Sequence, residues 1–280
     1  MQSPINIDTG GAWFDPELRP MDLGDYSLVD HVQMTLVNRG GHTAEISYSG
    51  KALYIRGGGL LGEYQLDQLH FHWGPRFRNG SEHKLDWRHY PMELHIVHHQ
   101  RKKMSDGVAA AKEPNGLAVY AVLFKMVPHD NPKLNEIIRH LDQIQLSGNE
   151  IKIASFPLLE VLPATVARLF YRYDGSLTTP PCYESVIWTI AVDFIDISED
   201  QINKFRSLEG KEGQQLTDTH RPIQRLNGRK VRTTVHTKYI YVPSHAVGTH
   251  VNTGCLFPVM LLAPMLTLGV YFLSCCWHAC

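Results

Sequence analysis

The stretch LHFHWG, Leu69–Gly74, places two histidines one residue apart inside an apolar and aromatic run. Successive side chains of a β-strand point to opposite faces, so His70 and His72 share one face while Leu69 and Phe71 share the other. The chain contains 16 His, so a pair at this spacing also arises by chance. The pair alone therefore leaves two interpretations open, which are two ligands of a metal ion and two unrelated polar positions.

A third ligand is expected from the segment ELHIVHH, residues 93–99. If this segment pairs antiparallel with Leu66–Trp73, His95 completes a triangle with the first two histidines. Three neutral imidazoles with an open fourth position are typical of catalytic zinc. A structural zinc site would usually close with a cysteine, and Cys182 lies far away in the sequence, which disfavours that alternative.

Two further side chains share these faces and could orient the imidazoles. A histidine that binds zinc usually donates its other N–H to an oxygen atom. Gln68 lies two residues before His70, and Glu93 lies two residues before His95. The alternative for Glu93 is an ordinary solvated charge. His98 and His99 have no comparable support and are interpreted as ordinary polar positions.

The composition is that of a globular protein, with 43% hydrophobic and 20% charged residues and a net charge of −1. This balance gives no electrostatic reason to expect a nucleic acid partner. Short apolar segments of strand character, separated by Gly-rich turns, occupy the first part of the chain. The pattern predicts one sheet-dominated domain of α+β type with a few peripheral short helices, over residues 1–243.

Two segments have helical character. Residues 131–146 carry Pro132 near their start and a stripe of leucines and isoleucines at helical spacing, which predicts one helix. Residues 198–208 begin with Ser198 and Gln201 in the spacing of a capping box.

Five motifs follow one another in register along the chain, and together they are highly specific. They are QSPINI (residues 2–7), QLHFHWG (68–74), GSEH (80–83), ELHIVH (93–98) and GSLTTPPC (175–182). The chain resembles the α-class carbonic anhydrases from Gln2 to about Tyr241, and among them the extracellular members linked to a glycosylphosphatidylinositol (GPI) anchor. The resemblance implies a central twisted, mostly antiparallel sheet with zinc at the bottom of a conical cleft.

The resemblance also assigns roles to single residues. It implies that His70, His72 and His95 hold Zn²⁺, whose bound hydroxide attacks carbon dioxide to give bicarbonate and a proton. Thr178 would accept a hydrogen bond from that hydroxide and donate one to Glu82. The remaining implied assignments are a proton shuttle at His42, an apolar carbon dioxide wall of Val97, Val119, Leu177, Val186 and Trp188, a bicarbonate neighbour at Thr179, and inhibition by sulphonamides and small anions.

The chain departs from the family pattern at its start. Met1 directly precedes the QSPI motif, where family members usually have a longer segment rich in Trp and Tyr. We therefore expect a truncated or alternatively spliced form, in which Cys182 lacks the cysteine that secreted relatives pair with it. Two other classes of function are weighed against the enzyme, namely a catalytically inactive binding module of the same fold and a zinc storage or sensing protein.

The C-terminal segment, residues 244–280, reads as a polar spacer followed by an apolar tail. Lys238 is the last charged residue, and Cys255–Trp277 is almost wholly apolar. The tail lacks the basic cluster that normally follows a transmembrane helix. We expect a GPI anchor at Ser244, with Gly248 and Asn252 as the next choices, and hence a catalytic domain on the outer face of the plasma membrane.

The alternative for this tail is a retained single transmembrane helix, palmitoylated at Cys275 or Cys276. The sequence NGS at Asn79 is also an acceptor sequon for N-glycosylation, which an extracellular location would allow.

Overall fold

The computed structural model describes residues 1–75, 79–101 and 106–236 of the 280-residue chain. Its strands are β1 (Asn6–Ile7), β2 (Trp13–Phe14), β3 (Met21–Asp22), β4 (Val32–Asn38), β5 (Ala44–Gly50), β6 (Tyr54–Gly57), β7 (Tyr64–Trp73), β8 (Lys84–Leu85), β9 (Met92–Gln100), β10 (Leu117–Met126), β11 (Glu150–Ile153), β12 (Phe170–Gly175), β13 (Val186–Ala191), β14 (Ile195–Ile197) and β15 (Arg232–Thr233). Its helices are η1 (Gly24–Ser27), α1 (Gly107–Ala110), η2 (Pro132–Leu134), α2 (Asn135–Ile138), η3 (Leu141–Ile144), α3 (Leu158–Val161) and α4 (Glu199–Arg206).

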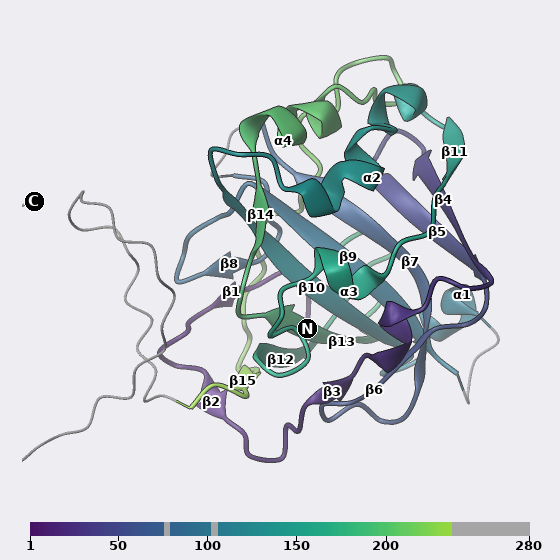
Figure 1. Cartoon of the computed structure of the whole chain (residues 1–280). Helices are drawn as coiled ribbons and strands as arrows, with labels where there is room; N and C mark the ends of the chain where they lie inside the picture. The colour runs from purple at the N-terminus through teal and green to yellow at the C-terminus, as the bar shows by residue number, and fades with distance from the viewer. Residues whose placement is uncertain (76–78, 102–105, 237–280) are drawn as a thin grey trace, which may run out of the picture. The chain divides into compact units, whose positions relative to one another are not determined.

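Within this part of the chain, one large twisted sheet of 13 strands forms the centre of the molecule (Figure 1). Its main path runs in the order β11-β4-β5-β7-β9-β10-β13-β12-β15-β2. Most neighbours are antiparallel, whereas β10 pairs with β13 and β15 pairs with β2 in parallel. Strands β1 and β8 form a separate two-stranded sheet. The prediction of a single strand-dominated domain with a few short helices is therefore confirmed.

The prediction of one continuous helix over residues 131–146 was wrong. The segment forms the short helices η2, α2 and η3 in succession. Leu134 and Ile137 are three residues apart, as are Leu141 and Ile144, which matches the three-residue repeat of a 3₁₀ helix. All four side chains are still buried, so the apolar stripe does reach the core.

The predicted N-terminus of α4 is confirmed. The Ser198 hydroxyl accepts a hydrogen bond from the backbone N–H of Gln201, and the Gln201 side chain accepts one from the backbone N–H of Ser198. This capping box satisfies two N–H groups that would otherwise lack partners.

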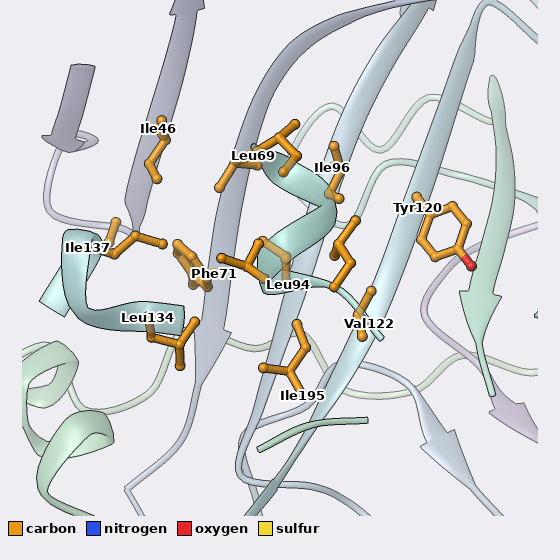
Figure 2. Packing of buried hydrophobic residues seen from close by; sticks show 14 of the residues in the cluster. Ile46, Leu69, Phe71, Leu94, Ile96, Tyr120, Val122, Leu134, Ile137 and Ile195 are labelled. Atoms are coloured by element: carbon orange, nitrogen blue, oxygen red, sulfur yellow. The ribbon is translucent and has the colours of Figure 1, made fainter. Parts of the chain in front are cut away.

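The two faces of the large sheet carry different side chains. On one face Leu69, Phe71, Leu94 and Ile96 pack beneath the short helices, together with residues such as Ile137 (Figure 2). The other face carries a smaller apolar cluster and the histidines of the opening motif. Strand β10 separates the two clusters by strict alternation, since its even-numbered residues 118–124 enter the first and its odd-numbered residues 117–123 the second.

A β-bulge in β7 sets which face the histidines occupy. Leu66 lies opposite His98 and Gln68 lies opposite Val97, so Asp67 is the extra residue. Before the bulge the core side chains are even-numbered, as at Leu66, and after it they are odd-numbered, as at Leu69. Without this change of phase the two histidines of β7 would point into the apolar core.

The interpretation of His98 and His99 as ordinary polar positions was wrong. Both side chains are buried, with 0% and 4% exposure. His98 Nδ1 donates to the carbonyl of Ala118 at 3.0 Å, and its Nε2 is paired with the hydroxyl of Tyr26. His99 Nδ1 lies 2.7 Å from Asp67 Oδ1. These partners come from other segments or from the bulge, so a single segment does not reveal them.

None of the helices in the described ranges has the length and apolar content needed to span a bilayer. The predicted anchor segment, residues 244–280 with Ser244, lies outside the described residues.

His98 makes stability depend on pH. Its burial lowers its pKa from 6.5 to about 4, so below pH 6.5 the unfolded chain takes up a proton that the folded chain refuses. The corresponding stability is complete above pH 6.5 and is lost as the pH falls towards 4. The variant His98→Gln keeps an acceptor for the Tyr26 hydroxyl but cannot take up a proton. As the pH falls from 6.5 to 4, we expect the wild type to lose about 3 kcal/mol more of its free energy of unfolding than this variant.

Urea denaturation at several pH values between these limits measures the difference. Other groups that titrate in the window are the same in both proteins and cancel. Parallel stability curves for the two proteins would show that His98 is not the responsible group.

Candidate metal centre

Three imidazoles meet on the face of β7 and β9 that lies opposite the larger apolar core. His70 lies directly opposite His95 in the antiparallel register, and His72 follows two residues along β7. One nitrogen of each ring lies within 4.8 Å of the corresponding nitrogens of the other two. The Nε2 atoms of His70 and His72 are 3.1 Å apart. The structure thus brings together the three histidines that the sequence singled out.

The outer nitrogen of each ring faces an oxygen acceptor. His70 Nδ1 lies 2.9 Å from Gln68 Oε1, and His95 Nε2 lies 2.8 Å from Glu93 Oε1. His72 Nδ1 lies 2.7 Å from the backbone carbonyl of Thr219. Each acceptor requires a proton on the nitrogen that faces it, so the hydrogen-bond network assigns the tautomer of all three rings.

The inner nitrogens are therefore lone-pair donors. They are Nε2 of His70, Nε2 of His72 and Nδ1 of His95. The 3.1 Å contact between His70 and His72 then joins two acceptors and is not a hydrogen bond. Tetrahedral zinc with Zn–N bonds of 2.0–2.1 Å would hold two such nitrogens about 3.3 Å apart. The three nitrogens thus fit a zinc-sized cation, and its fourth coordination position would stay open.

The protonation states favour metal binding as well. Burial, together with the neighbouring His72 and His95, lowers the pKa of His70 well below its ordinary value. Burial also lowers the pKa of His95, against the opposing effect of Glu93. Neutral imidazole is the form that binds a metal, so no proton has to be removed from these two rings at neutral pH.

Glu93 is the centre of a buried hydrogen-bond chain behind His95. Its Oε1 also faces His83 Nδ1 at 2.6 Å, and its Oε2 accepts the backbone N–H of His83 at 2.8 Å. His83 Nε2 then lies 2.6 Å from the hydroxyl of Tyr173. Burial raises the pKa of Glu93, but His83 and His95 outweigh it and hold that pKa well below its ordinary value. The second group with metal-ligand spacing, His83, Glu93 and His95, is thus already joined by hydrogen bonds.

Glu82 lies beside the three imidazoles with one oxygen unused. Its side chain is 1% exposed, and its Oε1 accepts the backbone N–H of Arg221 at 2.8 Å. Its Oε2 lies 3.9 Å from His95 Nδ1 and has no hydrogen-bond partner. Thr178 is half-buried, and among the described residues no hydrogen bond joins it to Glu82. Oε2 of Glu82 is therefore a buried acceptor to which none of the described side chains donates.

The predicted apolar wall forms a continuous row across three strands. Val119 of β10 lies opposite Val97 of β9 on one side and opposite Trp188 of β13 on the other. Val186 and Leu177 belong to the same cluster or pack against it. The row lies two residues along β9 from His95, which is about 7 Å in a strand. The Trp188 ring is 4.9 Å from that of His95, so the wall borders the imidazoles directly.

His42 is exposed in the turn between β4 and β5. The adjacent Thr43 hydroxyl donates to the backbone carbonyl of Phe71, which lies between the two histidines of β7. This bond holds the turn beside the metal centre. Within the described ranges, no hydrogen bond or ring contact joins His42 to the three imidazoles.

The remaining predicted residues lie at the surface. Thr179, next to Thr178, is exposed. Asn79 is also exposed, whereas the Ser81 hydroxyl of the same sequon is buried and donates to the carbonyl of His83 at 2.7 Å.

Sequence reasoning missed three residues of the centre. Thr219 and Arg221 act through backbone groups, which carry no side-chain signature and come from a loop far along the chain. His83 could have been found, because it follows Glu82 within the GSEH motif.

The comparisons with known proteins agree with this geometry. The profile of the eukaryotic-type carbonic anhydrase family matches residues 1–235. The chain is 38% identical to human carbonic anhydrase 7 over 237 residues, covering 82% of this chain and 87% of that protein, and mouse carbonic anhydrase 7 gives the same values. Mouse carbonic anhydrase 1 is 35% identical over 235 residues, covering 82% of this chain and 88% of the relative. The chain therefore belongs to the eukaryotic-type carbonic anhydrase family, and it is a carbonic anhydrase.

Proposed function

We propose that the chain binds Zn²⁺ through His70, His72 and His95 and catalyses the reversible hydration of carbon dioxide to bicarbonate and a proton. Carbonic anhydrases of this family act on carbon dioxide, and zinc is their typical metal. The observation that carries the proposal is the convergence of three unprotonated imidazole nitrogens, each fixed by an oxygen acceptor on its outer side. When bound there, the metal supplies a nucleophile from water at neutral pH, a step for which this family is the standard example.

The buried acid beside the histidines would orient the reacting water. Oε2 of Glu82 is a buried acceptor without a donor among the described residues. Leaving it unpaired costs free energy, so a donor that binds to it is stabilised. We infer that the hydroxyl of Thr178 donates a hydrogen bond to this oxygen, and that the oxygen atom of the same hydroxyl accepts a hydrogen bond from the attacking water. This orientation directs the water's remaining lone pair at the substrate carbon.

The row of apolar side chains matches the substrate. Carbon dioxide is small and has no net dipole, so it gains little from polar partners and enters the space along Val97, Val119 and Trp188 without leaving any polar group unsatisfied. Bicarbonate is an anion and is less compatible with that wall, which favours its release past Thr179. Small anions and sulphonamides, which inhibit carbonic anhydrases in general, would compete for the same open position.

Hydration releases one proton for each carbon dioxide, and this proton has to reach solvent. His42 is exposed, and its turn is tied to β7 by the Thr43 hydroxyl. A histidine side chain can accept a proton on one ring nitrogen and release one from the other. We infer that His42 carries the proton from the metal centre to solvent.

The triad can be tested by removing one ligand. We expect His95→Ala to lower zinc affinity by more than about 100-fold, since losing even an outer hydrogen-bond partner of a ligand costs 10–100-fold. Carbon dioxide hydration should be lost with the metal. Stopped-flow hydration assays and metal analysis after dialysis measure the two effects.

His129→Ala is the matched control, because it removes an exposed imidazole elsewhere on the surface. It should retain one zinc ion per chain and full activity. A His95→Ala protein with undiminished zinc and activity would refute the assignment. A wild-type chain that holds zinc and never hydrates carbon dioxide would favour the inactive binding module.

The proton route gives a separate prediction. We expect His42→Ala to slow turnover on the order of 10-fold in dilute buffer, and added imidazole to restore part of the rate, because a soluble base can replace the missing one. Hydration is measured across a series of imidazole concentrations, with His129→Ala as the control. A uniform loss that imidazole does not rescue would indicate a structural role instead.

We further propose that the chain is displayed on the outer face of the plasma membrane, attached at Ser244 through a GPI anchor. The support is the order of polar spacer and apolar tail without a closing basic cluster. Glycosylation at Asn79 belongs to the same proposal, and the exposure of that side chain supports it. The alternative remains a retained transmembrane helix.

Phosphatidylinositol-specific phospholipase C tests the anchor. Expressed behind a secretory signal peptide, the chain should leave the cell surface after treatment, because the enzyme cleaves the lipid from the glycan. Retention of the protein together with a C-terminal epitope tag would establish the transmembrane alternative.

A further inference from the structure

Two large aromatic side chains lie exposed at one edge of the molecule. Trp13 of β2 is 56% exposed, and Trp87, in the turn after β8, is 71% exposed. Both Asp86 and Trp87 have positive φ, 49° and 65°, in a two-residue hairpin turn between Leu85 and Arg88. Such turns favour Asn-Gly, so a bulky tryptophan at this position is unfavourable for folding alone.

Neighbouring elements hold the two tryptophans on the same edge. The backbone N–H of Trp87 donates to Asn6 of β1, and the Asp86 carboxylate accepts two hydrogen bonds from Thr9. The chain then continues from Thr9 through Ala12, which packs in one apolar cluster with Leu85, into Trp13. Figure 1 shows β1, β2 and β8 on one flank of the sheet and α1 on the opposite flank.

The described chain ends at this edge. Strand β2 is the last strand of the main path and pairs in parallel with β15, the last strand in sequence. The ring of His236, the last described residue, lies 4.8 Å from that of Phe14, which directly follows Trp13. From His236 the chain continues for 44 residues, up to Cys280, which include the apolar run Cys255–Trp277.

The charges at this edge suit the headgroup layer of a bilayer. Arg88 and Lys230 are exposed and free to meet lipid phosphates. The acids beside them keep their charge and are hydrogen-bonded within the protein, Asp86 by Thr9 and Asp8 by the backbone N–H groups of Gly10 and Gly11, so the edge carries both signs, as a phosphatidylcholine headgroup does. Tryptophan is enriched at membrane interfaces because its ring is apolar while its N–H stays hydrated.

We propose that Trp13 and Trp87 form a lipid-contact edge that enters the headgroup region of the membrane to which the tail attaches the protein. The inference rests on the proposed membrane attachment and adds an orientation to it. The domain would stand with the end of the sheet at β2 against the bilayer, and α1 would lie away from it.

Quenching by brominated lipid tests this edge. The full chain, expressed behind a secretory signal peptide, is reconstituted into phosphatidylcholine vesicles with or without bromine near the headgroup. Two of the four tryptophans of the described chain lie on this edge and the other two, Trp73 and Trp188, are buried. The anchored protein has lost the apolar tail and Trp277 with it, so we expect roughly half of the emission to be quenched in the wild type, and little in Trp13→Ser/Trp87→Ser.

The matched control adds Val108→Trp to the double variant, since Val108 of α1 is 74% exposed on the opposite flank. Its emission should be the same in both lipids. Vesicle-bound protein with equal wild-type emission in both lipids would overturn the lipid-contact edge and leave the anchor intact. A chain found only in the soluble fraction would refute membrane attachment and the edge together.

Discussion

The antiparallel register between β7 and β9 is the constraint on which the rest of the centre depends. It sets His70 opposite His95 and gives both strands a common face on the side away from the larger apolar core. Because side chains alternate with a period of two, a slip of one residue would exchange the histidines with Phe71 and Leu94. The burial of those two apolar side chains in the core therefore holds the polar face in place. The bulge at Asp67 allows the phase of β7 to change without loss of pairing.

The centre depends next on acceptors that surround the three rings. A buried polar group needs a hydrogen-bond partner, because leaving it unpaired costs free energy. The outer nitrogens have such partners in an amide, a carboxylate and a backbone carbonyl. In the neutral rings, the same bonds leave the inner nitrogens without protons. Three lone pairs then face one another at short range, and a single cation can accept all three. The proposed affinity for metal would thus originate in the hydrogen bonds outside the triad as much as in the triad itself.

The chemistry of the site follows from the contrast between two sets of side chains around His95. Glu93, His83 and Tyr173 form a buried hydrogen-bonded chain that keeps the carboxylate ionised behind His95. Val97, Val119 and Trp188 offer only carbon and one indole whose N–H is already bonded to the carbonyl of Ser176. In the proposed reaction, the first set would hold His95 in position on the metal, and the second would admit carbon dioxide. This division suits a reaction between water and carbon dioxide.

Much of this organisation could be predicted from the sequence, since it depends on short-range periodicity. The alternation in LHFHWG and ELHIVHH placed the three histidines, Gln68 and Glu93 on one face, and the order of the motifs indicated the family. Local patterns also predicted the strands and the cap of α4. They overestimated the regularity of residues 131–146, because an apolar stripe with spacings of three and four is compatible with a broken helix as well as a continuous one.

Only the tertiary structure decided which groups complete the centre. Thr219 and Arg221 contribute backbone atoms from a loop more than a hundred residues away from the histidines, and backbone atoms leave no trace in the sequence. The burial of His98 and His99 depends on Tyr26 and Asp67, which belong to other segments or to a bulge. Local sequence determines the direction in which each side chain points along its own strand, whereas its partner is set by the packing of distant segments, which no local pattern encodes.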